Sequence, residues 1–117
     1  MSAKWGKLLD TLIELTEAGK ISWQANDWSG DFEAELGKHQ VKLEEELFGE
    51  QFKISLMNFH REVVDSFTDE DLTDQGFSNA FSKFNKLQTS IRRQLNGSEA
   101  ALEEVLKDLQ DIKDLNQ

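Results

Sequence analysis

The chain has 117 residues, no Cys, and a formal net charge of −10 that arises from 23 acidic side chains against 13 Lys and Arg. This length predicts one domain over residues 1–117, the lack of Cys excludes disulfides, and the charge disfavours direct binding to nucleic acid or an anionic membrane. Because no apolar segment is long enough for a signal sequence or a membrane span, we expect a soluble cytoplasmic protein that binds a basic protein.

An amphipathic helix is predicted over about residues 3–18. Its apolar side chains recur every three or four residues and form one stripe, made by Trp5, Leu8, Leu9, Leu12, Ile13 and Leu15. Gly19 ends the helix, because glycine adopts the left-handed conformation of a helix C-terminus at little cost.

The segment LLDTLIELTEAGKISW, residues 8–23, contains the step GKI-x-W directly after this helix. It resembles the opening of small, uncharacterised bacterial and phage-type α+β proteins, in which a short helix runs through such a step into antiparallel strands. The resemblance covers the opening quarter of the chain. No activity is attached to those proteins, so the resemblance implies no function, cofactor or site residue.

A β-hairpin is predicted over residues 32–43, where apolar and charged side chains alternate. Gly37 and Lys38 suit a two-residue turn of type II′. This turn predicts three cross-strand pairs, Phe32 with Leu43, Glu33 with Lys42 and Ala34 with Val41.

A second hairpin is predicted over residues 51–67, around a polar tip at Asn58 to Arg61. Its two possible registers are Ile54 opposite Val64, from a three-residue loop, and Leu56 opposite Val63, from an even-numbered loop. We prefer the first register, because the second sets Asp65 against Ile54.

Helical spacing returns over residues 77–95 and 98–115, with Asn96 and Gly97 between the two segments. The chain is therefore predicted to be an α+β domain with an N-terminal helix, an antiparallel meander sheet of about four strands, and a C-terminal helical hairpin packed on one face. The expected core comprises Leu8, Leu12, Phe32, Val41, Leu43, Ile54, Phe81, Phe84, Ile91, Leu102, Val105 and Leu109.

The acidic segment TDEDLTDQG, residues 68–76, predicts the start of a helix. It does not fit a calcium-binding EF-hand loop, because the sixth position from Asp69 is Asp74 instead of Gly and the twelfth is Ala80. Thr68 suits the N-cap position, and acidic side chains in the first turn are favoured by the helix dipole. We therefore favour a helix N-terminus over a cation site.

Charge is distributed unevenly along the chain. Residues 76–97 contain no acid but four cations, Lys83, Lys86, Arg92 and Arg93. A basic helix gains modest attraction from an acidic helix beside it. Whether Arg92 and Arg93 also form a binding patch stays open.

Five acids share one side of the first predicted hairpin, namely Asp31, Glu33, Glu35, Glu44 and Glu46. The predicted register sets Asp31 opposite Glu44, and facing like charges destabilise a strand pair. Such a surface either fits a basic partner or serves solubility alone. Phe59, at the tip of the second hairpin, is a candidate apolar anchor for the same partner.

The sequence contains few residue patterns that could form a catalytic or metal-binding site. The chain has two His, His39 and His60, both near predicted hairpin tips and neither with a second ligand at metal-binding spacing. We therefore expect no enzyme, no metal and no cofactor. Trp23 and Trp28 are expected to cover or join the core.

The leading functional prediction is a small acidic protein-binding domain that neutralises or inhibits a basic partner, as an immunity protein, an anti-defence inhibitor or a DNA mimic would. One alternative is a secretion-chaperone-like dimer. Another is a small-ligand-binding domain of a bacterial or phage protein. The sequence leaves the identity of the partner and the oligomeric state open.

Overall fold

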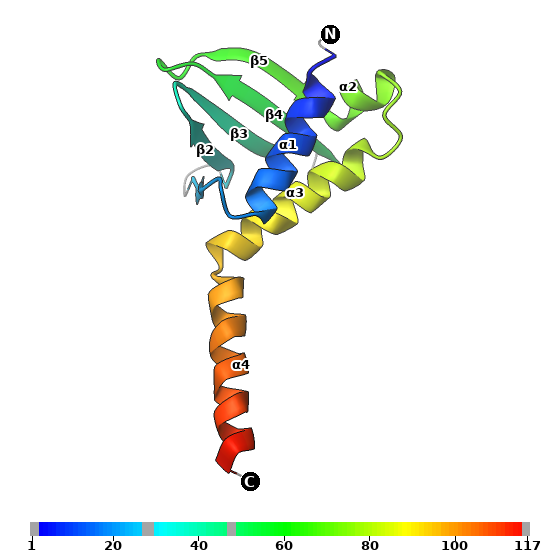
Figure 1. The fold of residues 1–117 in the computed structure, drawn as a ribbon. Coiled ribbons are helices and arrows are strands. Elements are labelled where there is room, and N and C mark those ends of the chain that lie inside the picture. Colours follow the sequence, from blue (N-terminus) through cyan, green and yellow to red (C-terminus); the bar gives the residue numbers. More distant parts are fainter. Residues whose placement is uncertain (1–2, 27–29, 47–48, 116–117) are drawn as a thin grey trace.

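The computed structural model describes residues 3–26, 30–46 and 49–115. It confirms the α+β fold class, with one helix before an antiparallel sheet and helices after it (Figure 1). The elements are α1 (Trp5–Glu17), β1 (Trp23–Ala25), β2 (Phe32–Leu36), β3 (His39–Glu46), β4 (Gln51–Met57), β5 (Val63–Thr68), α2 (Asp69–Asp74), α3 (Ala80–Leu95) and α4 (Ser98–Leu115). The sheet has five strands in chain order, close to the expected number of about four.

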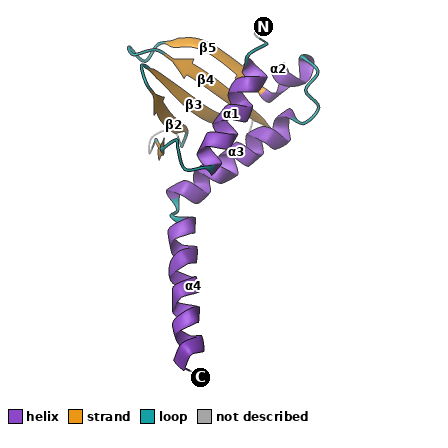
Figure 2. Cartoon of the chain, in the orientation of Figure 1, coloured by secondary structure: helices purple, strands orange, loops and turns teal. Residues whose placement is uncertain are grey.

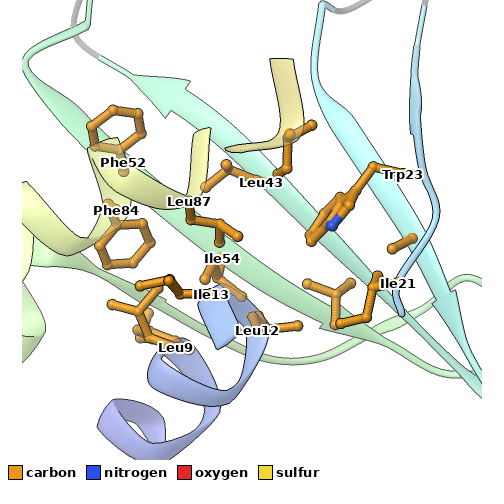
Figure 3. Close-up of a cluster of buried hydrophobic side chains, with 14 of the residues drawn as sticks. Leu9, Leu12, Ile13, Ile21, Trp23, Leu43, Phe52, Ile54, Phe84 and Leu87 are labelled. Atoms are coloured by element: carbon orange, nitrogen blue, oxygen red, sulfur yellow. The ribbon is translucent and has the colours of Figure 1, made fainter. Parts of the chain in front are cut away.

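The core lies between one face of the sheet and the helices α1 and α3, which cover that same face (Figure 2). Apolar residues from the sheet and from both helices meet there (Figure 3), including Leu9, Leu12, Trp23, Val41, Leu43, Ile54, Phe84, Leu87 and Ile91. Of the predicted core residues, Leu8 and Phe32 are partly buried against this cluster.

The end of α1 matches the prediction. Gly19 has a φ of 72°, and the next N–H, from Lys20, donates to the carbonyl of Leu15 at 2.9 Å. These are the features of a Schellman motif. The chain then turns into β1, where Trp23 is buried and its Nε1 donates to Thr16 Oγ1 at 2.9 Å. Trp23 is thus a core residue, as expected, whereas Trp28 lies outside the described residues.

The β2–β3 hairpin has the predicted register. Its pairs include Phe32 with Leu43, Glu33 with Lys42 and Ala34 with Val41. Gly37 has a positive φ of 66°, whereas the φ of Lys38 is not positive. This combination is that of the expected type II′ turn.

Both predicted registers of the β4–β5 hairpin are wrong. The observed pairs include Ile54 with Phe67 and Leu56 with Asp65. Five residues separate β4 from β5 and are centred on His60, one residue later than in the register that we preferred, and a bulge next to Leu56 and Met57 shifts the register further. Arg61 adopts a φ of 63° in this loop. This backbone conformation is uncommon for Arg, so the sequence did not predict it.

The acidic segment at residue 68 begins a helix, as predicted. Thr68 Oγ1 accepts a hydrogen bond from the Asp71 N–H at 3.2 Å, and Asp71 Oδ2 accepts one from the Thr68 N–H at 2.9 Å. Asp69 has a different role, because its buried carboxylate accepts a hydrogen bond from the Phe52 N–H at 2.8 Å. The segment therefore joins α2 to β4.

The predicted position of the last helix is wrong. We expected it to fold back over the sheet, but α4 extends away from the rest of the chain (Figure 1). Leu102, Val105 and Leu109, expected in the core, are 49%, 52% and 56% exposed. An apolar stripe shows that a helix can pack, but it does not specify the surface against which the helix packs.

Phe81 is the other predicted core residue that the structure places differently, since 43% of it is exposed. It lies at the margin of the core, where its ring centroid is 5.2 Å from that of Phe52. The helical spacing placed Phe81 in the apolar stripe of α3. The spacing alone does not show how far the sheet extends beneath that stripe, and Phe81 lies at its margin.

Gln94 connects the end of α3 to the start of the sheet. Its Oε1 accepts a hydrogen bond from the Trp23 N–H at 2.7 Å, and its Nε2 donates to the Ile21 carbonyl at 2.7 Å. One amide side chain therefore satisfies two backbone groups next to a buried Trp.

We expect Gln94→Ala to lower the free energy of unfolding by about 1–3 kcal/mol, because both backbone groups lose their side-chain partner. Urea unfolding followed by Trp fluorescence measures this change. Thr89→Ala, at an exposed position of the same helix, is the control and should change stability by less than about 0.5 kcal/mol. Equal losses in the two variants would show that the Gln94 contacts contribute nothing specific.

Candidate functional site

The acids that the sequence singled out lie on the side of the sheet that faces away from α1 and α3, which we call the open face. Side chains alternate along a strand, so the neighbours of the buried Ala34, Val41 and Leu43 point to this side. The predicted acids on the strands are Glu33, Glu35, Glu44 and Glu46. The fifth, Asp31, precedes β2.

Lys42 lies between two of these acids. Its Nζ is 3.4 Å from Asp31 Oδ2 and 3.5 Å from Glu44 Oε1. Burial alone would lower the pKa of Lys42, but the attraction of Glu44 and Asp31 outweighs it and raises the pKa above its ordinary value. The repulsion that the sequence suggested between Asp31 and Glu44 is therefore relieved by one cation.

Two further cations bind acids of the open face. Arg61, at the β4–β5 turn, lies 3.3 Å from Glu33 on β2, two strands away in the sheet. Lys53 lies 3.7 Å from Glu46. Among the described residues, Glu35 has no cation within 4.0 Å. The open face thus combines five carboxylates with three cations and keeps an excess of negative charge.

The basic helix α3 pairs with acids of the same domain. Three of its cations form ion pairs, Lys83 with Asp10 at 2.8 Å, Lys86 with Glu17 at 3.5 Å and Arg92 with Glu45 at 3.4 Å. The acidic helix beside α3 is therefore α1. Arg92 has a structural partner, and the acids of α4 project with that helix away from the basic one (Figure 1).

An apolar tip borders the open face at the β4–β5 turn. Phe59 is 79% exposed, and two other apolar residues near the turn, Val63 and Val64, are also exposed. Asn58 Oδ1 accepts hydrogen bonds from the N–H groups of His60 at 2.9 Å and Glu62 at 3.0 Å. These bonds hold the turn that displays Phe59.

Two hollows lie near these surfaces. One, of about 440 Å³, is lined in part by Glu33, Glu35, Gln40 and Arg61 of the open face and the adjoining turn. The other, of about 580 Å³, lies where the ends of α1 and α3 meet the start of α4, and Arg93 lines it. Both are open to solvent and polar at several positions.

The two His residues form no metal site with other side chains of the described residues. His39 and His60 are both exposed. In the described part of the chain, no three His, Cys, Asp or Glu residues lie together in a way that could hold a metal ion, and no helix there is long and apolar enough to span a membrane.

Searches against protein-family models, curated proteins and solved structures gave no match to this chain.

Sequence reasoning placed the acids of the open face on one side, and it missed the cations that hold them. Lys42 was assigned to the correct strand pair, but its contact with both Asp31 and Glu44 depends on side-chain geometry. The contact between Arg61 and Glu33 was hidden because the register of the β4–β5 hairpin decides where Arg61 lies. The only sequence signal was the presence of basic residues near an acidic cluster.

We expect Lys42→Gln to lower the free energy of unfolding by about 1 kcal/mol at neutral pH, because Asp31 and Glu44 then lose the ammonium that lies between them. Since the pKa of Lys42 is raised, its ammonium stabilises the fold at neutral pH, and this contribution is lost only as the pH rises through that pKa. Urea unfolding measures the change.

The matched variant combines Lys42→Gln with Glu44→Gln, which removes one of the two facing charges. It should recover most of the lost stability. If the double variant were less stable than Lys42→Gln alone, repulsion between the two carboxylates would not be the cause.

Proposed function

We propose that this chain is a small acidic binding domain that captures a basic protein partner on its open face and thereby neutralises or inhibits it. Immunity proteins, anti-defence inhibitors and DNA mimics act in this way. The observation that carries the proposal is the open face itself, where a carboxylate-rich sheet surface is left uncovered by the helices and is bordered by the exposed Phe59.

The negative charge of the chain favours a basic partner both during its approach from solution and at contact. The net charge of −10 attracts a positively charged protein from solution and raises its association rate. At contact, the carboxylates are already held in place by Lys42, Lys53 and Arg61. A carboxylate has several lone pairs, so it accepts bonds from a partner's Lys or Arg while keeping its own cation.

The apolar tip supplies the part of an interface that does not depend on charge. Aromatic residues surrounded by polar contacts commonly contribute most of the binding free energy of a protein interface. Phe59 has this setting, since it stands at the margin of the open face on a turn held by Asn58. The tip therefore fits an apolar pocket within the basic surface of a partner.

A second candidate function is a secretion-chaperone-like dimer. The observation that favours it is α4, whose apolar side chains have about half or more of their surface exposed. Sedimentation of the free chain tests this candidate, because the chaperone requires a dimer and a chain that stays monomeric would exclude it, whereas a neutralising inhibitor acts in either state.

The open face is tested with the triple variant Glu33→Gln, Glu35→Gln and Glu44→Gln. A partner is first captured from a lysate of the source cells at low salt and identified by mass spectrometry, and the purified partner is then titrated by calorimetry. We expect the triple variant to weaken its binding by roughly tenfold, with a smaller salt dependence, because three attractive charges are removed.

The matched control is Glu103→Gln, Glu104→Gln and Asp111→Asn on α4, which changes the net charge by the same amount. It should bind nearly as well as the natural chain. A further variant, Phe59→Ala, should weaken binding equally at low and moderate salt, because its contact is apolar. Equal effects of the two charge variants would assign binding to overall charge and contradict a specific open face.

A further inference from the structure

Helix α4 carries an apolar stripe along its length that the rest of the domain leaves exposed. Its members are Leu102, Val105, Leu106, Leu109 and Ile112, and they are 49% to 65% exposed. The helix extends from the body with its C-terminus at the far end (Figure 1), and the molecule is 62 Å long as a result. An isolated helix of 18 residues is only marginally stable in water, and an exposed apolar stripe of this size is typical of a surface that packs against another protein.

The spacing of the stripe is that of a coiled coil. Four of these residues, Leu102, Val105, Leu109 and Ile112, follow one another at successive spacings of three, four and three residues. This spacing places them at the a and d positions of two heptads. Leu106 follows at an e position and widens the stripe. The most acidic positions, including Glu103 and Glu104, lie away from the a and d seam.

The stripe faces away from the body at the start of α4. Ala100 lines the hollow that the helix forms with the ends of α1 and α3, together with Thr16 and Ser90. In the heptad that begins at Leu102, Ala100 occupies an f position, on the opposite side of the helix from a and d. A second helix can therefore lie along the stripe without meeting the body that carries it.

The charges that flank the seam match those of an identical helix. Asp108 occupies a g position and Lys113 the following e position, and a parallel coiled coil brings each g residue close to the next e residue of the other helix. Two copies in parallel form two Asp108–Lys113 pairs. In an antiparallel arrangement with Leu102 against Ile112, Asp108 meets its own counterpart, and the like charges repel.

We propose that α4 associates in parallel with α4 of a second copy of this chain. The two stripes then bury each other in one apolar seam. The two sheets lie outside this seam, and each keeps its own open face. The assembly presents the open face more than once, so a partner with repeated basic sites binds with higher avidity than to one copy. This inference rests on α4, which the binding function proposed for the open face does not use.

Analytical ultracentrifugation of the full chain tests the proposal from low micromolar to near-millimolar concentration. We expect reversible association above the monomer mass of 13.4 kDa. The variant Leu102→Gln with Leu109→Gln should raise the dissociation constant by roughly a hundredfold, because Gln keeps helix propensity but removes the apolar seam. The control Lys107→Gln with Asp114→Asn, at f positions, should associate normally. Circular dichroism checks that each variant keeps the sheet and helices of the body.

Charge exchange tests the parallel orientation. Asp108→Lys and Lys113→Asp should each weaken association severalfold, and the double exchange should restore it, because only parallel helices bring these positions together. A chain that stays monomeric at every concentration overturns the proposal. Association that survives Leu102→Gln with Leu109→Gln, or that the double exchange fails to restore, overturns the α4 interface or its parallel orientation.

Discussion

Burial of one face of the sheet beneath α1 and α3 is the interaction on which the rest of the structure depends. Phe84, Leu87 and Ile91 of α3 are fully buried and meet Leu9 of α1 and Ile54 of the sheet. Each such side chain contributes about 1.5–3 kcal/mol when it leaves water. Because two helices suffice to cover this face, no described helix covers the opposite face, and the apolar side chains of the last helix stay exposed. Both surfaces that we propose as binding surfaces follow from this arrangement.

Polar contacts at the margins of the core fix how the helices join the sheet. Asp69 binds the Phe52 N–H at the start of β4, and Gln94 binds two backbone groups around Trp23. The ion pairs of α3 with α1 add a charged boundary on the solvent side, as between Lys83 and Asp10. On the open face the same kind of pairing serves another purpose, because it holds carboxylates in fixed positions while leaving a negative excess.

The sequence was sufficient where local rules decide the structure and insufficient where they do not. The β2–β3 register followed from the turn chemistry of Gly37 and from the alternation of apolar side chains. The β4–β5 register depended on a bulge and on a positive φ at Arg61, and neither has a signal in the residue types. The apolar stripe of α4 was correctly identified, but its packing partner was not, because the same spacing suits a core and an interface. The sequence placed the acids of the open face on one side of the hairpin, and the cations that pair with them were found only in three dimensions.

The chain therefore consists of a body with a complete core and an exposed helix that lacks one. Hydrogen exchange followed by mass spectrometry at low micromolar concentration tests this division most directly. The amides of residues 84–91 in α3 should exchange slowly, as core amides do, and those of residues 102–112 in α4 should exchange far faster, because a lone helix of this length opens readily. Equal protection of the two segments in a chain that sediments as a monomer would contradict the account, since α4 would then pack within its own domain.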